Sequence, residues 1–181
     1  MPLAPTLVGD GIVLHGLQAE DVGPDYVAWL NDPEVNRFLE TRHTSQTHES
    51  VVGFVAEKAD SGDSFLFGIY VGESGRHVGN IKLGPVRAEH DLAEVSLFIG
   101  ARDAWGQGIG ARAISLVSRF GFEQLSLRKL SASIYAPNIA SVRAFKRAGW
   151  RQEAVLPAHY LLDDVPVDII VMGLLAEAGG S

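Results

Sequence analysis

The chain contains no cysteine, and this absence excludes several classes of chemistry. Disulfides, thiolate metal sites and mechanisms with a covalent cysteine intermediate are all ruled out. Basic residues are also scarce, with 15 Lys and Arg against 22 Asp and Glu and a formal net charge of -7. Such a surface has no general attraction for nucleic acid or anionic membranes, so any phosphate must be bound by a local group.

Long hydrophobic runs are missing as well. No stretch approaches the length needed to cross a bilayer, and the opening MPLAPTLVGDG has no basic region followed by an apolar core. We therefore expect a cytoplasmic protein with no membrane or nucleic-acid partner. The six histidines show no metal-ligand spacing, and we expect no metal. With 181 residues, 46% of them hydrophobic, and no long linker, the chain is predicted to be a single domain, 1–181.

Hydrophobic periodicity predicts an α/β fold of the α+β kind, with a mixed and mostly antiparallel sheet flanked by helices. The first strand spans 11–17 and leads into helical segments at 19–32, 33–40 and 45–59, the last capped by Thr47. The remaining elements are strands at 64–71, 77–86 and 93–100, a helix from Gly108, a strand at 129–136, a helix at 138–150, and strands at 150–156 and 167–175.

The stretch RDAWGQGIGARAI, residues 102–114, places three glycines between a strand and an amphipathic helix. A helix start leaves backbone N–H groups without partners, and its dipole favours an anion. The stretch lacks the lysine and hydroxyl of a P-loop. Gly106, Gly108 and Ala111 fit a dinucleotide fingerprint, but no acidic residue follows at the required distance. A tight turn that only permits close packing is the remaining alternative.

The stretch Trp105 to Gly110 resembles the pyrophosphate loop of the GNAT N-acetyltransferase superfamily, in which Gln or Arg precedes Gly-x-Gly by two residues. Trp105 replaces the Gln or Arg, as in the branch that resembles ribosomal-protein N-terminal acetyltransferases. The strand AEVSLFIG, the helix NIASVRAFKRAGW and the closing hairpin follow in family order. The resemblance covers nearly the whole chain and implies a sheet that splays between residues 93–100 and 129–136, with acetyl-CoA in the gap.

Cofactor contacts follow from this resemblance and from the need for local positive charge around a polyanion. The predicted contacts are Phe98, Ile99, Trp105, Gly106, Gln107, Gly108, Ile109, Gly110, Asn138, Arg143 and Lys146. For the two basic residues on the second helix, a solvated helix face is the alternative.

Transfer to an amine needs a base, because an amine is mostly protonated at neutral pH. Glu94, on the strand that lines the acetyl group in the family, is the predicted base, acting directly or through water; strand alternation could instead point it to solvent. Many relatives protonate the departing thiolate with a tyrosine, but Phe145 stands there and Ser141 is the substitute candidate. A serine at this position could equally serve the helix start. The resemblance implies direct attack, with a backbone N–H of SLFIG stabilising the oxyanion.

The resemblance implies that the acceptor binds between two segments, residues 29–45 and residues 159–168, where Arg37, Glu40, Arg42 and His159 could contact it. Two acceptor classes stay open: a small-molecule amine such as an amino sugar on a nucleotide carrier, or a peptide N-terminus. A catalytically silent CoA-binding or partner protein on the same fold is the rival interpretation. The sequence also leaves open whether the chain is a monomer or a homodimer.

Overall fold

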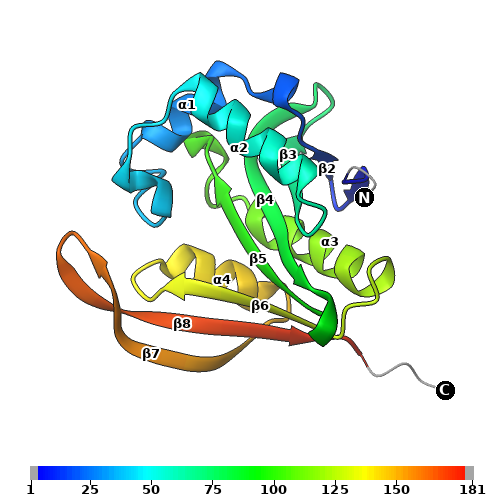
Figure 1. The fold of residues 1–181 in the computed structure, drawn as a ribbon, viewed down its shortest axis with the longest axis vertical. Coiled ribbons are helices and arrows are strands. Elements are labelled where there is room, and N and C mark those ends of the chain that lie inside the picture. The colour runs from blue at the N-terminus through cyan, green and yellow to red at the C-terminus, as the bar shows by residue number, and fades with distance from the viewer. Residues whose placement is uncertain (1–3, 178–181) are drawn as a thin grey trace.

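Eight strands form one sheet in the order β1-β2-β3-β4-β5-β6-β8-β7 (Figure 1). The computed structural model describes residues 4–177, so residues 1–3 and 178–181 of the predicted domain lie outside it. The strands and helices are β1 (Leu7–Gly9), β2 (Ile12–Gly16), α1 (Pro24–Asn31), α2 (His48–Asp60), β3 (Phe65–Val71), β4 (Arg76–Arg87), β5 (Leu92–Ile99), α3 (Ile109–Glu123), β6 (Lys129–Tyr135), α4 (Ile139–Arg147), β7 (Arg151–Leu162) and β8 (Val165–Leu175).

The sheet is open between β5 and β6. These two strands are the parallel pair, and they are in register only over Leu92–Glu94 and Lys129–Ser131. Beyond that point the strands diverge, as Figure 1 shows, while every other neighbouring pair is antiparallel. The predicted mixed, mostly antiparallel and splayed sheet is therefore confirmed.

Helices cover both faces of the first five strands. The side chains of β3 alternate between these faces and contact helices on each. Phe65 and Phe67 pack edge-on against Phe120 of α3, with ring centroids 5.1 and 5.7 Å away. Leu66 points to the opposite face and belongs to the cluster formed by α1 and α2. Because successive side chains in a strand point to opposite faces, β3 serves two cores. The helix α4 lies beside α3.

Two predictions for the N-terminal part are wrong. An extra strand, β1, pairs with β2 through a turn at Asp10 and Gly11, whose φ angles of 52° and 73° suit a hairpin turn. Residues 33–40 are not a helix but a series of turns that ends in a 3-10 helix at Glu40–His43. The Asn36 side chain donates to Leu30 O at 2.8 Å, which favours the turn over a helix.

The predicted helix starts are confirmed. Thr47 Oγ1 accepts from Ser50 N at 3.1 Å, and Ser50 Oγ accepts from Thr47 N at 3.0 Å, so α2 begins with a reciprocal cap. Asn138 Oδ1 accepts from Ser141 N at 3.2 Å and fixes the start of α4. That start lies directly after β6, at the wide end of the gap in the sheet.

Candidate active site

A cavity of about 500 Å³ lies where β5 and β6 part. One wall, contributed by α1, α2 and β3, is apolar and includes Leu30, Val51, Phe54 and Leu66. The polar residues of the lining other than tyrosines come from β4, β5, β6, the segment before α2 and the start of α4; they are Glu40, Thr41, Gln46, Asn80, Lys82, Ser96, Ser133, Asn138 and Ser141. The cavity thus combines an apolar body with polar groups near the gap.

The glycine junction gives α3 an accessible N-terminus. Gly106 and Gly108 have φ angles of 75° and 73°, in the left-handed region that other residues avoid. A Cβ at either position would meet nothing within 4 Å, so the backbone is open to an approaching ligand. Backbone N–H groups of residues 106–111 have no partner within residues 4–177. These features fit a pyrophosphate, which such N–H groups would hold.

Side-chain hydrogen bonds stabilise the glycine junction. Trp105 Nε1 donates to Ile99 O at 2.7 Å and ties the loop to the end of β5. Asp103 receives two hydrogen bonds from Arg76, at 2.6 and 2.8 Å, while Gln107 Nε2 donates to Asp103 O at 2.8 Å. The predicted residues Trp105 and Gln107 therefore have structural partners, and each stays exposed.

Arg102 links this junction to the acceptor segment. Its guanidinium forms ion pairs with Asp32, at 3.6 Å, and with Glu34, both of which follow α1 directly. Nearby, the ring of Trp29 occupies the space that a Cβ on Gly100 would fill. The end of α1 is therefore seated against the segment that leads into the glycines.

The other predicted cofactor residues lie on β5, α3 and α4, beside the gap. Phe98 lines the cavity, and Gly110 faces α4, where an added Cβ would be in ordinary contact with Ala144, 3.7 Å away. Arg143 and Lys146 are exposed on α4, without an ion pair in the described part of the chain. Their positive charge is thus available to an anion near the two helices.

The predicted catalytic residues occupy different places. Ser141 lines the cavity at the start of α4, next to the capping residue Asn138. Glu94 is exposed, lies 3.8 Å from Arg87, and is not part of the cavity lining. Its neighbour on the same face of β5, Ser96, is part of the lining. The structure therefore brings Ser141 to the cavity and leaves Glu94 at its edge.

The predicted acceptor residues also separate into two groups. Glu40 lines the cavity and contacts Arg42 at 3.4 Å. Arg37 instead pairs with Asp163 at 3.8 Å, and His159 is exposed beside the ring of Tyr160. Neither Arg37 nor His159 belongs to the lining. Of the four, Glu40 and Arg42 are the two that the fold joins.

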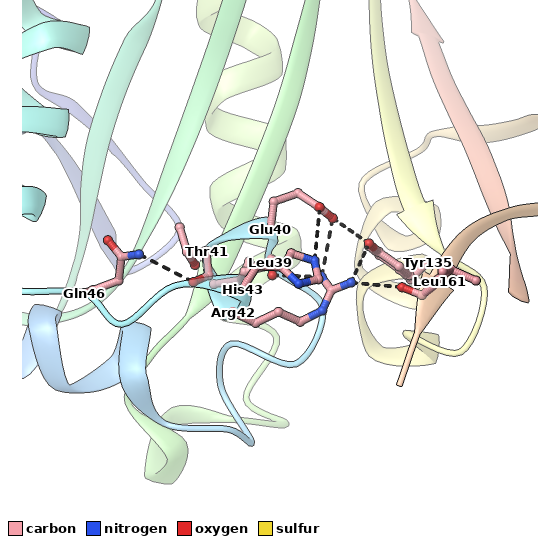
Figure 2. Close-up of polar contacts among 8 residues, drawn as sticks. All are labelled: Leu39, Glu40, Thr41, Arg42, His43, Gln46, Tyr135 and Leu161. Carbon is pink, nitrogen blue, oxygen red and sulfur yellow. Dashed lines mark hydrogen bonds and ion pairs between the residues drawn. The ribbon is translucent and has the colours of Figure 1, made fainter. Parts of the chain in front are cut away.

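Tyr135, which the sequence did not single out, completes this contact. Its hydroxyl donates to Glu40 Oε1 at 2.5 Å and accepts from Arg42 Nη2 at 3.0 Å (Figure 2). Burial, together with the Glu40 carboxylate, raises the pKa of Tyr135, so the hydroxyl keeps its proton. No local signal reveals this contact, because Tyr135 is 95 residues from Glu40 in the chain.

Three more residues of the lining were missed. Burial lowers the pKa of Lys82, which lies opposite Ser96 in the β4–β5 register. Thr41 Oγ1 and Asn80 Nδ2 are buried without a hydrogen-bond partner within residues 4–177. Buried polar groups without partners are rare in proteins, and both residues line this one cavity. A bound ligand is one source of the missing partners.

Within residues 4–177, no group of three His, Cys, Asp or Glu could hold a metal ion. In the same range, no helix is both long and apolar enough to cross a membrane.

Comparisons with known proteins agree on one family. A family model described as an acetyltransferase (GNAT) domain matches residues 12–151. The uncharacterized N-acetyltransferase YoaA of Bacillus subtilis is 25% identical, over 94% of this chain and 97% of its own length. The spermidine N-acetyltransferase of Vibrio cholerae, solved with CoA and spermine, superposes with a TM-score of 0.81 at 16% identity, over 92% of this chain and 96% of that chain. A second Vibrio cholerae structure, provisionally assigned as a ribosomal-protein-serine acetyltransferase, has a TM-score of 0.72 at 19% identity, over 97% of this chain and all of that chain.

Proposed function

This chain belongs to the GNAT acetyltransferase family, and on that basis we propose that it transfers the acetyl group of acetyl-CoA to the amine of a small molecule. The observation that carries the proposal is the glycine junction at the start of α3, which stands beside the gap in the sheet and its cavity. An anion site next to a cavity is the arrangement that a thioester with a pyrophosphate handle requires.

Residues on both sides of the gap would hold the cofactor, which supplies an activated acetyl group. The backbone N–H groups of residues 106–111 bind the pyrophosphate, and Arg143 and Lys146 add positive charge. Asn138 contacts the cofactor at the start of α4, while the backbone at Phe98 and Ile99 orients the acetyl end. These roles are inferred from the open backbone, the exposed cations and the family membership.

Two side chains handle the proton transfers of the reaction: one acts on the acceptor's ammonium group and the other on the departing thiolate. Glu94 takes the proton of the acceptor's ammonium, through a water because its carboxylate lies outside the lining. Ser141 donates a hydrogen bond to the departing thiolate and relays to it the proton that the attacking nitrogen loses as the amide forms. Direct attack by the amine is the economical route, since the chain has no cysteine for a covalent intermediate.

The acceptor is the least constrained part. The apolar wall and the volume of about 500 Å³ favour a small molecule. Arg37 and Arg42, the basic residues that would have to bind the phosphates of an amino-sugar nucleotide, are engaged with Asp163 and with Glu40 and Tyr135. A peptide N-terminus is the second candidate, because one structural neighbour is assigned to ribosomal-protein-serine acetylation. The location in the cytoplasm and the single-domain extent of 1–181 remain predictions.

Release of CoA thiol tests the proposal. The purified protein is incubated with acetyl-CoA and, in turn, phenethylamine, spermidine, an amino-sugar nucleotide and a short peptide, with a thiol reagent as the readout. The proposal expects amine-dependent thiol release with at least one small molecule. Release only with the peptide would support the second candidate. No release with any amine, despite acetyl-CoA binding, would favour a silent CoA-binding protein and contradict the proposal.

A further inference from the structure

We propose that Tyr135 is a positioning residue that holds Glu40 as the anchor for the acceptor's ammonium group, so that the site selects a cationic amine with an apolar body. This inference rests on the proposed function, because it concerns the same cavity. The three side chains Glu40, Arg42 and Tyr135, together with Leu161 O, are called the clasp.

Arg42 has no free N–H at its two terminal nitrogens. Nη1 donates to Leu39 O at 2.9 Å and to Glu40 Oε1 at 3.4 Å. Nη2 donates to the hydroxyl oxygen of Tyr135 at 3.0 Å and to Leu161 O at 3.0 Å. Each terminal nitrogen carries two hydrogens, so these four bonds use all of them. Arg42 therefore joins the segment before α2 to β6 and β7, and it has no terminal N–H left for an acceptor phosphate.

The direction of the hydrogen bonds fixes the orientation of Glu40. Arg42 can only donate, so the Tyr135 oxygen accepts from it and the hydroxyl proton must point elsewhere. That proton goes to Glu40 Oε1, 2.5 Å away (Figure 2). The second oxygen, Oε2, has no hydrogen-bond partner within residues 4–177, where the exposed His43 ring lies 3.8 Å away. One carboxylate oxygen is thus held and the other is left to bind a cation.

The position of the clasp places Glu40 Oε2 where the ammonium group of an acceptor in the cavity could contact it. Glu40, Tyr135 and Tyr160 all belong to the cavity lining, and the Glu40 side chain is 68% exposed, so it stands at the opening. The apolar wall described above belongs to the same cavity and comes from α1, α2 and β3. A protonated amine with an aromatic or aliphatic body satisfies both surfaces. A nucleotide carrier would place phosphates beside an acid.

A pair of probes that differ in charge tests this class. Phenethylamine and phenethyl alcohol share an apolar body, and only the first carries an ammonium group. Their affinities are measured by calorimetry with the protein saturated with CoA. Wild-type protein is expected to prefer the amine by about tenfold, as for a charge-assisted contact at a partly exposed site. Equal affinities, or no binding of either probe, would overturn the inferred acceptor class.

Variants then separate positioning from simple packing. Glu40→Gln should remove the preference, and Tyr135→Phe should remove most of it while keeping the ring contacts with Phe38 and Tyr160. In the Glu40→Gln background, Tyr135→Phe should change nothing further, because the tyrosine acts through the carboxylate. The KM for phenethylamine should rise about tenfold in either single variant, with kcat and acetyl-CoA affinity nearly unchanged.

Matched controls come from the same chain. Tyr70→Phe removes a hydroxyl outside the lining, and Glu57→Gln neutralises an exposed acid that pairs with Lys58. Both controls should retain the preference for the amine. Additive effects of the Glu40 and Tyr135 substitutions, or a preference that survives Glu40→Gln, would overturn the positioning role. Absence of acetyl-CoA binding in the wild-type protein would instead overturn the proposed function itself.

Discussion

The two sides of the gap differ in whether they offer backbone groups or side chains to a ligand. The cofactor side, residues 102–112 with the start of α4, presents mostly backbone: glycines with φ near +75° and N–H groups without partners. The acceptor side, residues 37–46 with Tyr135 and the walls of α1 and α2, presents side chains that meet from distant parts of the chain. A backbone site depends on a few glycines and on little else in the sequence, whereas a side-chain site changes with each substitution in its lining. The cofactor side is accordingly the part expected to be shared among relatives, and the acceptor side the part expected to be particular to this protein.

Gly108→Glu should have the largest effect, because it attacks the backbone side directly. A carboxylate would fill and charge the open space at the start of α3, and acetyl-CoA affinity should fall more than about 100-fold. Calorimetry measures the loss. Gly72→Glu is the matched control, with the same φ of 73° and equally open surroundings in the β3–β4 turn. Unchanged acetyl-CoA affinity in Gly108→Glu would remove the loop from the cofactor side.

Glu94→Gln tests whether catalysis needs a side chain at the edge of the gap. Turnover should drop about 100-fold, the usual scale for a lost general base, while acetyl-CoA affinity stays near that of the wild type. Steady-state kinetics across pH, with Glu89→Gln as an exposed control, gives the answer. Wild-type turnover at every pH would assign the base to another group or to solvent.

Gly100→Ala examines whether the two sides are mechanically joined. The added methyl would collide with the ring of Trp29 on α1, so the free energy of unfolding should fall by about 1–3 kcal/mol. Denaturant unfolding measures the change, and Gly53→Ala, at an open position on α2, should be neutral or slightly stabilising. Full stability in Gly100→Ala would mean that α1 moves away without cost and that the two sides are independent.

A smaller effect on the free energy of unfolding, confined to alkaline pH, is expected from Tyr26, which lines the cavity on α1. Burial raises the pKa of Tyr26 to about 12 from the usual 10.0. Between pH 10 and 12 the unfolded tyrosine loses its proton while the folded one keeps it. The free energy of unfolding should therefore fall with rising pH in this window, by about 1.4 kcal/mol per pH unit at most. Tyr26→Phe should flatten that slope in urea titrations; an identical slope would show that the hydroxyl is not desolvated.

The same contrast explains what the sequence could and could not predict. Gly106, Gly108 and Asn138 act through local backbone geometry, so their places at helix starts were readable from neighbouring residues. The contact of Arg42 with Tyr135 spans 93 residues and depends on how the two parts of the splayed sheet come together. Residues 33–40 had a helix-like pattern, yet side-chain bonds such as Asn36 to Leu30 O selected turns.

Glu94 combines a feature that local sequence predicts, its place on a strand, with one that it does not, the position of its carboxylate. Its position on β5 was correctly placed, but strand alternation and the short β5–β6 pairing decide where its carboxylate goes. The side chain lies against Arg87 and outside the lining, which a strand pattern alone does not specify. Its role as base stays a prediction for the kinetics to decide.

The most direct test of the account is a calorimetric titration of the purified protein with acetyl-CoA, with NADH as the control ligand. Both ligands carry a pyrophosphate, so the pair separates a GNAT loop from a dinucleotide site with the same glycines. We expect saturable, micromolar binding of acetyl-CoA and no binding of NADH. Binding of NADH alone, or of neither ligand, would contradict it and leave the glycine junction as a structural turn.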